Sequence, residues 1–111
     1  MKHDRLERMV KGWFVGAFQP TALSTSACEV AVKHYRAGDH DDEHYHKVAT
    51  EITLVLSGQV KMLNKVWSDG DIITLSPGEA TAFVALTDAI TVVVKLPGVL
   101  DDKYFLNLQQ D

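Results

Sequence analysis

The chain has 111 residues, 46% of them hydrophobic and 23% charged, which is the composition of a folded globular protein rather than a disordered, collagen-like or coiled-coil one. Its net charge is −4 and it has no basic run, so it lacks the electrostatic footprint expected of a nucleic-acid-binding protein. The single cysteine, Cys28, excludes an internal disulfide and a cysteine-based zinc site.

Membrane attachment and secretion are not expected either. The longest apolar stretches, such as 13–18 and 90–94, are too short to span a bilayer. The N-terminal residues carry charges where a signal peptide needs an apolar stretch. We therefore expect one cytoplasmic domain over residues 1–111, with partners among small molecules rather than nucleic acids or membranes.

The expected secondary structure is almost entirely β. Leu6, Met9 and Val10 lie at helical spacing before Gly12, which predicts only a short N-terminal helical segment. After it come short stretches that alternate or are rich in β-branched residues, separated by turn signals at roughly ten-residue spacing. These strand-like stretches are 13–18, 28–35, 50–56, 59–63, 72–75, 81–86 and 90–95. The pattern predicts an all-β antiparallel sandwich or barrel with its core at about residues 13–96.

Histidines gather in one part of the chain. Four of the five lie between His34 and His46. His44 and His46 are separated by one residue, so on a strand they would project from the same face. Glu51 begins the next expected strand and would lie beside them if the two strands are neighbours. Two imidazoles and a carboxylate are typical ligands of a divalent metal such as non-haem iron, although an H-x-H pair is also common on solvated strands.

The glycines on either side of these residues complete a recognisable pattern. The chain resembles the cupin superfamily in the spacing of Gly38, His44, His46, Glu51 and Gly58, which fills every position of the first cupin motif. The resemblance covers about residues 28–97. It implies a single antiparallel cupin-type β-barrel or jelly roll with a metal and substrate site inside. It also implies His44, His46 and Glu51 as ligands of a divalent metal ion: Fe, Mn, Ni or Zn.

The second motif departs from the family pattern at the fourth ligand. Gly70-Asp71 and Ser76–Gly78 resemble its turns, but Thr81 stands where the family has a histidine. A threonine hydroxyl is a poor ligand for these metals compared with imidazole. A metal would then be held by three groups with more open positions, or be held weakly, or be absent. Phe83 would share the inward face with Thr81 and line the pocket.

The resemblance implies a fold more narrowly than an activity, because cupins include oxygenases, isomerases, epimerases, decarboxylases and non-catalytic binders. The favoured hypothesis is a metal-dependent enzyme of the isomerase, epimerase or oxygenase type, acting on a sugar-like or organic-acid substrate. The alternative is a non-catalytic binding or sensing barrel with a degenerate metal site. Without metal, Glu51 would be a carboxylate among apolar walls, with a raised pKa suited to general acid or base catalysis.

Three further expectations concern the surfaces of the strands. The acidic run over 39–43 is expected as a solvated loop. Lys33 and Lys95 lie on expected strands, and an inward lysine would be a costly buried cation unless it met a carboxylate or a substrate. If Glu51 faces inward, the apolar positions 52, 54 and 56 face outward together. Such a patch is seldom left bare by a monomer, so we expect a homodimer.

Overall fold

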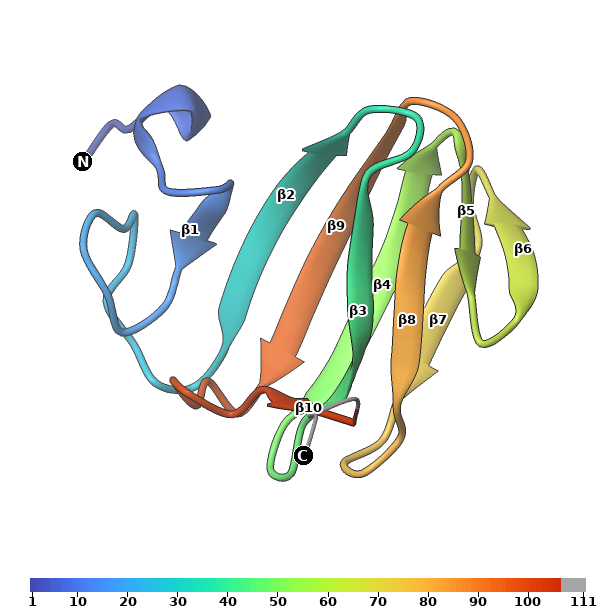
Figure 1. Ribbon diagram of the computed structural model, residues 1–111. Coiled ribbons are helices and arrows are strands. Elements are labelled where there is room, and N and C mark those ends of the chain that lie inside the picture. Colours follow the sequence, from blue (N-terminus) through green and yellow to red (C-terminus); the bar gives the residue numbers. More distant parts are fainter. Residues whose placement is uncertain (107–111) are drawn as a thin grey trace, which may run out of the picture.

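The computed structural model describes residues 1–106, and these are almost entirely β (Figure 1). A short 3₁₀ turn, η1 (Leu6–Arg8), precedes the strands. In chain order the strands are β1 (Trp13–Val15), β2 (Glu29–Tyr35), β3 (His40–Tyr45), β4 (Thr50–Ser57), β5 (Gln59–Met62), β6 (Lys65–Ser68), β7 (Ile72–Leu75), β8 (Thr81–Ala85), β9 (Ala89–Leu96) and β10 (Tyr104–Phe105). Within the described residues, no helix is both long and apolar enough to cross a membrane.

The predicted all-β class with a short helical segment at the N-terminus is confirmed. The helical segment is shorter than the spacing of Leu6, Met9 and Val10 suggests. The side chain of its N-cap residue makes no capping hydrogen bond and none of its residues is buried, so neither capping nor packing stabilises a longer helix.

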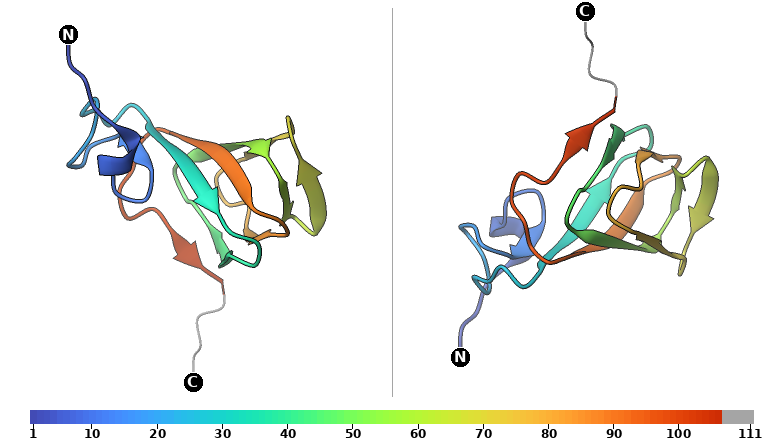
Figure 2. Two further views of the ribbon diagram at one scale, coloured as in Figure 1. Left: turned by 90° about the horizontal axis from the view of Figure 1, so that it is seen from above. Right: turned by 90° about the horizontal axis from the view of Figure 1, so that it is seen from below.

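The strands form two antiparallel sheets that face each other. One sheet has the order β1-β2-β9-β4-β7 and the other β10-β3-β8-β5-β6. Figure 2, which looks from above and from below, shows the sheets as two layers. Consecutive strands often lie in different sheets, as β3 and β4 do. This crossing brings the end of β3 and the start of β4 together across a short connection over 46–49.

The inward face of β4 changes character along the strand. Glu51, Thr53 and Val55 point between the sheets, and Thr53 and Val55 are 3% and 0% exposed. Val55 belongs to the apolar core, whereas Glu51 lies at the polar end of the barrel. The core is made of Val55, Val60, Met62, Ile73, Leu75, Phe83, Ala85 and Ala89. One strand thus supplies both the core and the site, as its alternation predicts.

The two motif glycines occupy backbone positions that other residues would disturb. Gly38, in the turn between β2 and β3, has φ +96°, and Gly58, between β4 and β5, has φ +91°. A Cβ atom on Gly58 would overlap the carbonyl oxygen of Asp88. Glycine is therefore favoured at both positions by the local geometry.

The acidic run over 39–43, expected as a loop, instead supplies most of β3. The strand pairs with β8 through His40, Asp41 and His44, and with β10 through His44 and Tyr45. Asp42 and Glu43 remain exposed and Asp41 is half-buried. The loop expectation was wrong because backbone pairing tolerates charged side chains wherever they still reach water.

Candidate metal centre

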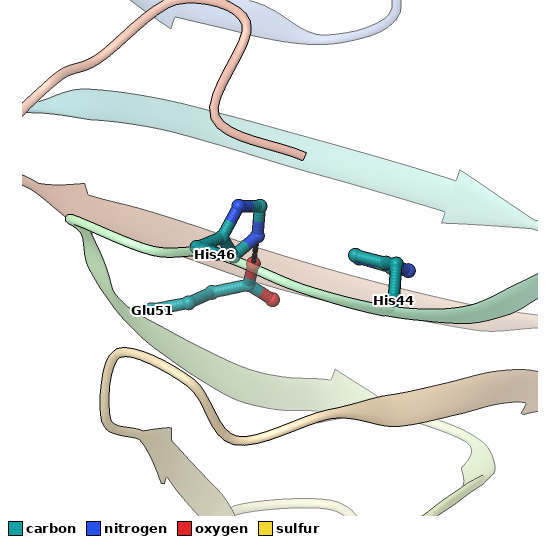
Figure 3. Close-up of side chains that lie close together, drawn as sticks. All are labelled: His44, His46 and Glu51. Atoms are coloured by element: carbon teal, nitrogen blue, oxygen red, sulfur yellow. Dashed lines mark hydrogen bonds and ion pairs between the residues drawn. The ribbon is translucent and has the colours of Figure 1, made fainter. Parts of the chain in front are cut away.

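The three predicted ligands meet at one end of the barrel. His44 lies near the end of β3, His46 directly follows that strand, and Glu51 is the second residue of β4. The nitrogen and oxygen atoms that they could offer to a metal all lie within 4.8 Å of one another. Figure 3 shows the three side chains, with His46 bonded to Glu51.

Each imidazole is held by a backbone carbonyl oxygen. Nδ1 of His46 lies 2.6 Å from the carbonyl oxygen of Asp102, and Nδ1 of His44 lies 2.8 Å from that of Asp42. Because a carbonyl oxygen only accepts, Nδ1 must donate in both rings, which leaves Nε2 for the site. Metal-binding histidines are typically fixed by such a hydrogen bond from their second ring nitrogen.

His46 and Glu51 form a direct, largely buried pair. Nε2 of His46 lies 2.8 Å from Oε1 of Glu51, and the side chains are 6% and 14% exposed. Since Nδ1 of His46 already donates, this second contact requires another proton on either the imidazole or the carboxyl group. A divalent cation could take the place of that proton. Two nitrogen donors and one carboxylate oxygen fit Mn, Fe, Ni or Zn.

The surroundings of Glu51 and His44 favour the ionised carboxylate and the neutral imidazole, which are the forms that bind metals. Burial by itself raises the pKa of Glu51, but the hydrogen bond and charge of His46, with smaller effects of Lys95 and His44, hold it below its ordinary value. The expectation of a raised pKa at Glu51 was therefore wrong, because the spacing did not reveal this hydrogen bond. Burial also lowers the pKa of His44, only partly opposed by the Asp42 carbonyl, and so favours the neutral imidazole that binds metals.

The C-terminal segment supports the site through contacts that no sequence pattern indicated. The buried carboxylate of Asp102 accepts hydrogen bonds from the backbone N–H groups of Lys47, Val48 and Ala49, at 3.0, 3.1 and 3.0 Å. Its carbonyl oxygen holds His46. Just beyond it, β10 pairs with β3, with Phe105 opposite His44. Asp102 is thus a functional candidate that sequence reasoning missed.

The candidate ligands line a cavity of about 640 Å³. Thr81 and Phe83, the other predicted pocket residues, also line it. Thr81 is the register neighbour of His44, but its hydroxyl accepts from the Leu63 N–H at 2.9 Å and donates to the Ala82 carbonyl at 2.7 Å. Phe83 lies against Tyr35, with 4.5 Å between ring centroids. Within the described residues, the other histidines are not part of the group that could hold a metal.

No protein-family model and no curated protein matches the sequence. Solved structures do match the fold. An uncharacterized conserved protein with a double-stranded beta-helix domain from Klebsiella pneumoniae has 25% identity and a TM-score of 0.63, over 67% of this chain and 66% of that one. DMSP lyase DddQ from Ruegeria pomeroyi has 17% identity and a TM-score of 0.68, over 89% of this chain and 52% of that one.

A third match is the bacterial pirin YhhW from Escherichia coli, determined in complex with nickel(II). It has 15% identity and a TM-score of 0.67, over 79% of this chain and 39% of that one. The chain therefore spans between 39% and 66% of the length of these three proteins. Together with the topology of the two sheets, these likenesses show that the chain has the double-stranded beta-helix fold, as the resemblance to cupins implies.

Proposed function

We propose that this cupin binds a divalent cation (Fe, Mn, Ni or Zn) through His44, His46 and Glu51, and acts on a small sugar-like or organic-acid molecule in the adjoining cavity. The reaction would be of the isomerase, epimerase or oxygenase type. One observation carries the proposal: three suitable donor atoms converge within 4.8 Å, and both imidazoles are already oriented by backbone carbonyls.

In this function each residue around the cavity would have its own role. The bound metal would supply Lewis-acid polarisation of a substrate oxygen. His44, His46 and Glu51 would hold it, and Asp102 would fix the His46 ring through its carbonyl oxygen. Thr81, whose hydroxyl is engaged with backbone groups, would leave space for substrate where a fourth ligand would otherwise stand. Phe83 would form an apolar wall that limits access of water.

The matched proteins support this proposal in general terms. The pirin is described with bound nickel(II), and DddQ is described as a lyase. A fold of this kind therefore holds a metal in one case and a reaction site in another.

A specific observation favours the alternative, a non-catalytic small-molecule-binding or sensing barrel with a degenerate metal site. His46 and Glu51 bond directly to each other, so this pair is satisfied without a metal. In that case the two histidines would bind a ligand through hydrogen bonds. The metal-dependent function is preferred because this alternative does not by itself explain why His44 converges on the same point.

We further infer that residues 1–111 form one domain that works in the cytoplasm as a homodimer and binds neither nucleic acid nor membrane. The net charge of −4 supports the absence of a nucleic-acid partner. The outer face of the sheet that contains β2, β9, β4 and β7 supports the dimer, because an apolar row of register neighbours crosses it: Val32, Val92, Leu54 and Ile72.

Metal analysis of untagged protein by mass spectrometry tests the proposal. The wild type is expected to retain or take up about one equivalent of metal, and His44→Ala to lose it. The matched control is His34→Ala, which removes an exposed histidine of β2 outside the candidate centre and should bind like the wild type. A folded wild type that takes up none of Mn(II), Fe(II), Ni(II) and Zn(II) would contradict metal binding and select the non-catalytic barrel.

A further inference from the structure

Two lysines point into the barrel beside the candidate metal centre. Lys33 of β2 and Lys95 of β9 line the same cavity as His44, His46 and Glu51. In the sheet register Lys33 lies opposite the fully buried Thr91, and Lys95 lies between Glu29 and Glu51 on its two neighbouring strands. Register neighbours share a face, so both lysines point inward.

Both ammonium groups lie over one aromatic ring. Nζ of Lys33 is 5.1 Å and Nζ of Lys95 is 4.9 Å from the centroid of the Trp13 ring. Strand β1 brings Trp13 to this place by pairing with β2, where Trp13 is the register partner of Ala31. The indole face attracts cations and so lowers the cost of holding two of them at one point.

Neither lysine is neutralised by an ion pair. Among residues 1–106, neither ammonium has a carboxylate oxygen within 4.0 Å. Two carboxylates of the same cavity are engaged elsewhere, since Glu51 is bonded to His46 and Asp102 to three backbone amides. Of the other carboxylates that line the cavity, Asp41 is half-buried and Asp101 is exposed. Glu29 is 6% exposed, and its Oε2 has no hydrogen-bond partner.

Four lysines and five carboxylates line the cavity, but none of the carboxylates forms an ion pair with Lys33 or Lys95. Burial lowers the pKa of Lys33; the charge of Asp41 opposes this effect, and Lys11, Lys95 and Lys103 lower the pKa further. Burial raises the pKa of Glu29, with Lys95 as the largest opposing influence. A small anion placed between Lys33 and Lys95 would relieve the repulsion between the lysines. A neutral ligand would leave two half-buried cations without a neighbouring anion, which is costly.

We propose that Lys33 and Lys95, on the floor made by Trp13, form an anion subsite for the carboxylate or phosphate group of the substrate. Ammonium groups form charge-assisted hydrogen bonds with both kinds of oxyanion. A ligand anchored there lies in the same cavity as His44, His46 and Glu51, toward which its remaining oxygen groups would extend. This inference rests on the proposed function and narrows its substrate from sugar-like or acidic molecules to anionic ones.

The test uses metal-free protein, treated with EDTA, so that its outcome does not depend on the metal site. The chain has two tryptophans, so Trp67→Phe leaves Trp13 as the only indole, directly beneath both lysines. Its fluorescence then reports ligand binding. Three probes share one ring and differ in the end group: benzoate, phenyl phosphate and the neutral benzamide. Calorimetric titration of the unsubstituted chain gives the same comparison without the Trp67 change.

At least one of the two anions is expected to bind about tenfold or more tightly than benzamide, and the tighter one identifies the end group. Lys33→Met and Lys95→Met should each weaken that anion about tenfold. The matched control is Lys65→Met, an exposed lysine of β6, which should leave binding unchanged. Lys33→Gln and Lys95→Gln replace either methionine variant if circular dichroism shows that it does not fold.

Three results would overturn the subsite: no anion binding by the folded protein, equal binding of anions and benzamide, or unchanged anion binding in both lysine variants. Failure of the metal site gives a different pattern. A chain that binds the anions through these lysines but takes up no metal contradicts the proposed metal function and leaves the subsite standing.

Discussion

Thr81 is the residue at which this site departs from the cupin pattern, and its surroundings explain how the fold accommodates it. It pairs in register with His44, and such pairs point to the same face of a sheet. Its side chain is 5% exposed, and its hydroxyl bonds to Leu63 and Ala82 of the backbone. Position 81 therefore borders the candidate centre. Its hydroxyl stabilises the adjacent backbone, so its oxygen is not free to bind a metal.

Thr81→His is expected to raise the affinity for Zn(II) about tenfold or more, because one added ligand commonly contributes at least ~1.4 kcal/mol. It should also lower the free energy of unfolding by about 1–3 kcal/mol, since the Leu63 N–H loses its acceptor and imidazole needs more room beside Phe83. Competition with a chromogenic chelator measures the affinity, and urea denaturation measures the stability.

Two controls separate these effects. Thr81→Val removes the hydroxyl without adding a donor, so it should cost stability and leave Zn(II) affinity unchanged. His46→Ala should abolish most binding. If a folded Thr81→His variant binds zinc no better than the wild type, position 81 does not face the proposed ligands, and the description as a three-ligand site is wrong.

At the scale of elements, the segment that leads from β9 to β10 acts as a brace for the site. It crosses the lower part of the molecule in Figure 1 and ends beside β3. Burial alone would raise the pKa of Asp102, but hydrogen bonds from the Ala49, Val48 and Lys47 amides hold it below its ordinary value. A carboxyl group whose pKa is lower in the folded state stabilises the fold above its unfolded pKa and loses this effect as the pH falls.

Asp102→Ala is accordingly expected to lower the free energy of unfolding by about 2 kcal/mol at pH 7, since three amides lose a charged acceptor. The difference from the wild type should be constant above about pH 5 and shrink as the pH falls below about 4, where Asp102 becomes protonated first in the unfolded chain and only at lower pH in the folded one. Urea denaturation across this range checks both points.

Asp42→Ala is the matched control, because Asp42 is an exposed residue of neighbouring β3. It should change stability by less than about 0.5 kcal/mol at either pH. A difference between the wild type and Asp102→Ala that stays constant down to pH 2 would show that the carboxylate charge is not what stabilises the 47–49 turn.

Where side chains alternate in polarity, the strands could be predicted from the sequence. On β4 the cupin resemblance placed Glu51 inside, and the two-residue period of a strand then put Thr53 and Val55 on the same inward face. The turn glycines marked the ends of strands. The first motif also singled out the residues that converge at the candidate centre. These features are local, because a strand's period and a turn's φ are properties of a few adjacent residues.

The rest depends on contacts between distant segments. Charged residues fill β3, so no apolar alternation marked it as a strand. Asp102 acts on His46 across 56 residues through a backbone oxygen, which every residue type possesses. The inward direction of Lys33 and Lys95 became clear only from their register with Thr91 and Glu51. Polar residues that serve a cavity interrupt the pattern from which inward faces are otherwise predicted.

At the scale of the whole molecule, the outer face of the sheet that contains β2, β9, β4 and β7 is apolar across its width. Val32, Val92, Leu54 and Ile72 form one row of register neighbours over these four strands. Ile72 is 64% exposed, so the chain itself leaves this end of the row open. The N-terminal residues do not cover this end of the row, since Leu6 and Val10 are themselves 40% and 59% exposed.

An apolar sheet face of this kind is rarely stable in water unless another surface covers it. A second copy of the chain offers the same apolar row, and a two-fold axis would place the two faces against each other. We therefore predict that light scattering at micromolar concentration gives twice the 12.3 kDa mass of one chain.

Ile72→Lys should give the monomer mass, because it would bury a charge in that interface. Val66→Lys, at a 55% exposed position on β6 of the other sheet, should remain dimeric. A monomer mass for the wild type, or a dimer that tolerates Ile72→Lys but not Val66→Lys, would show that this face is not where the subunits meet.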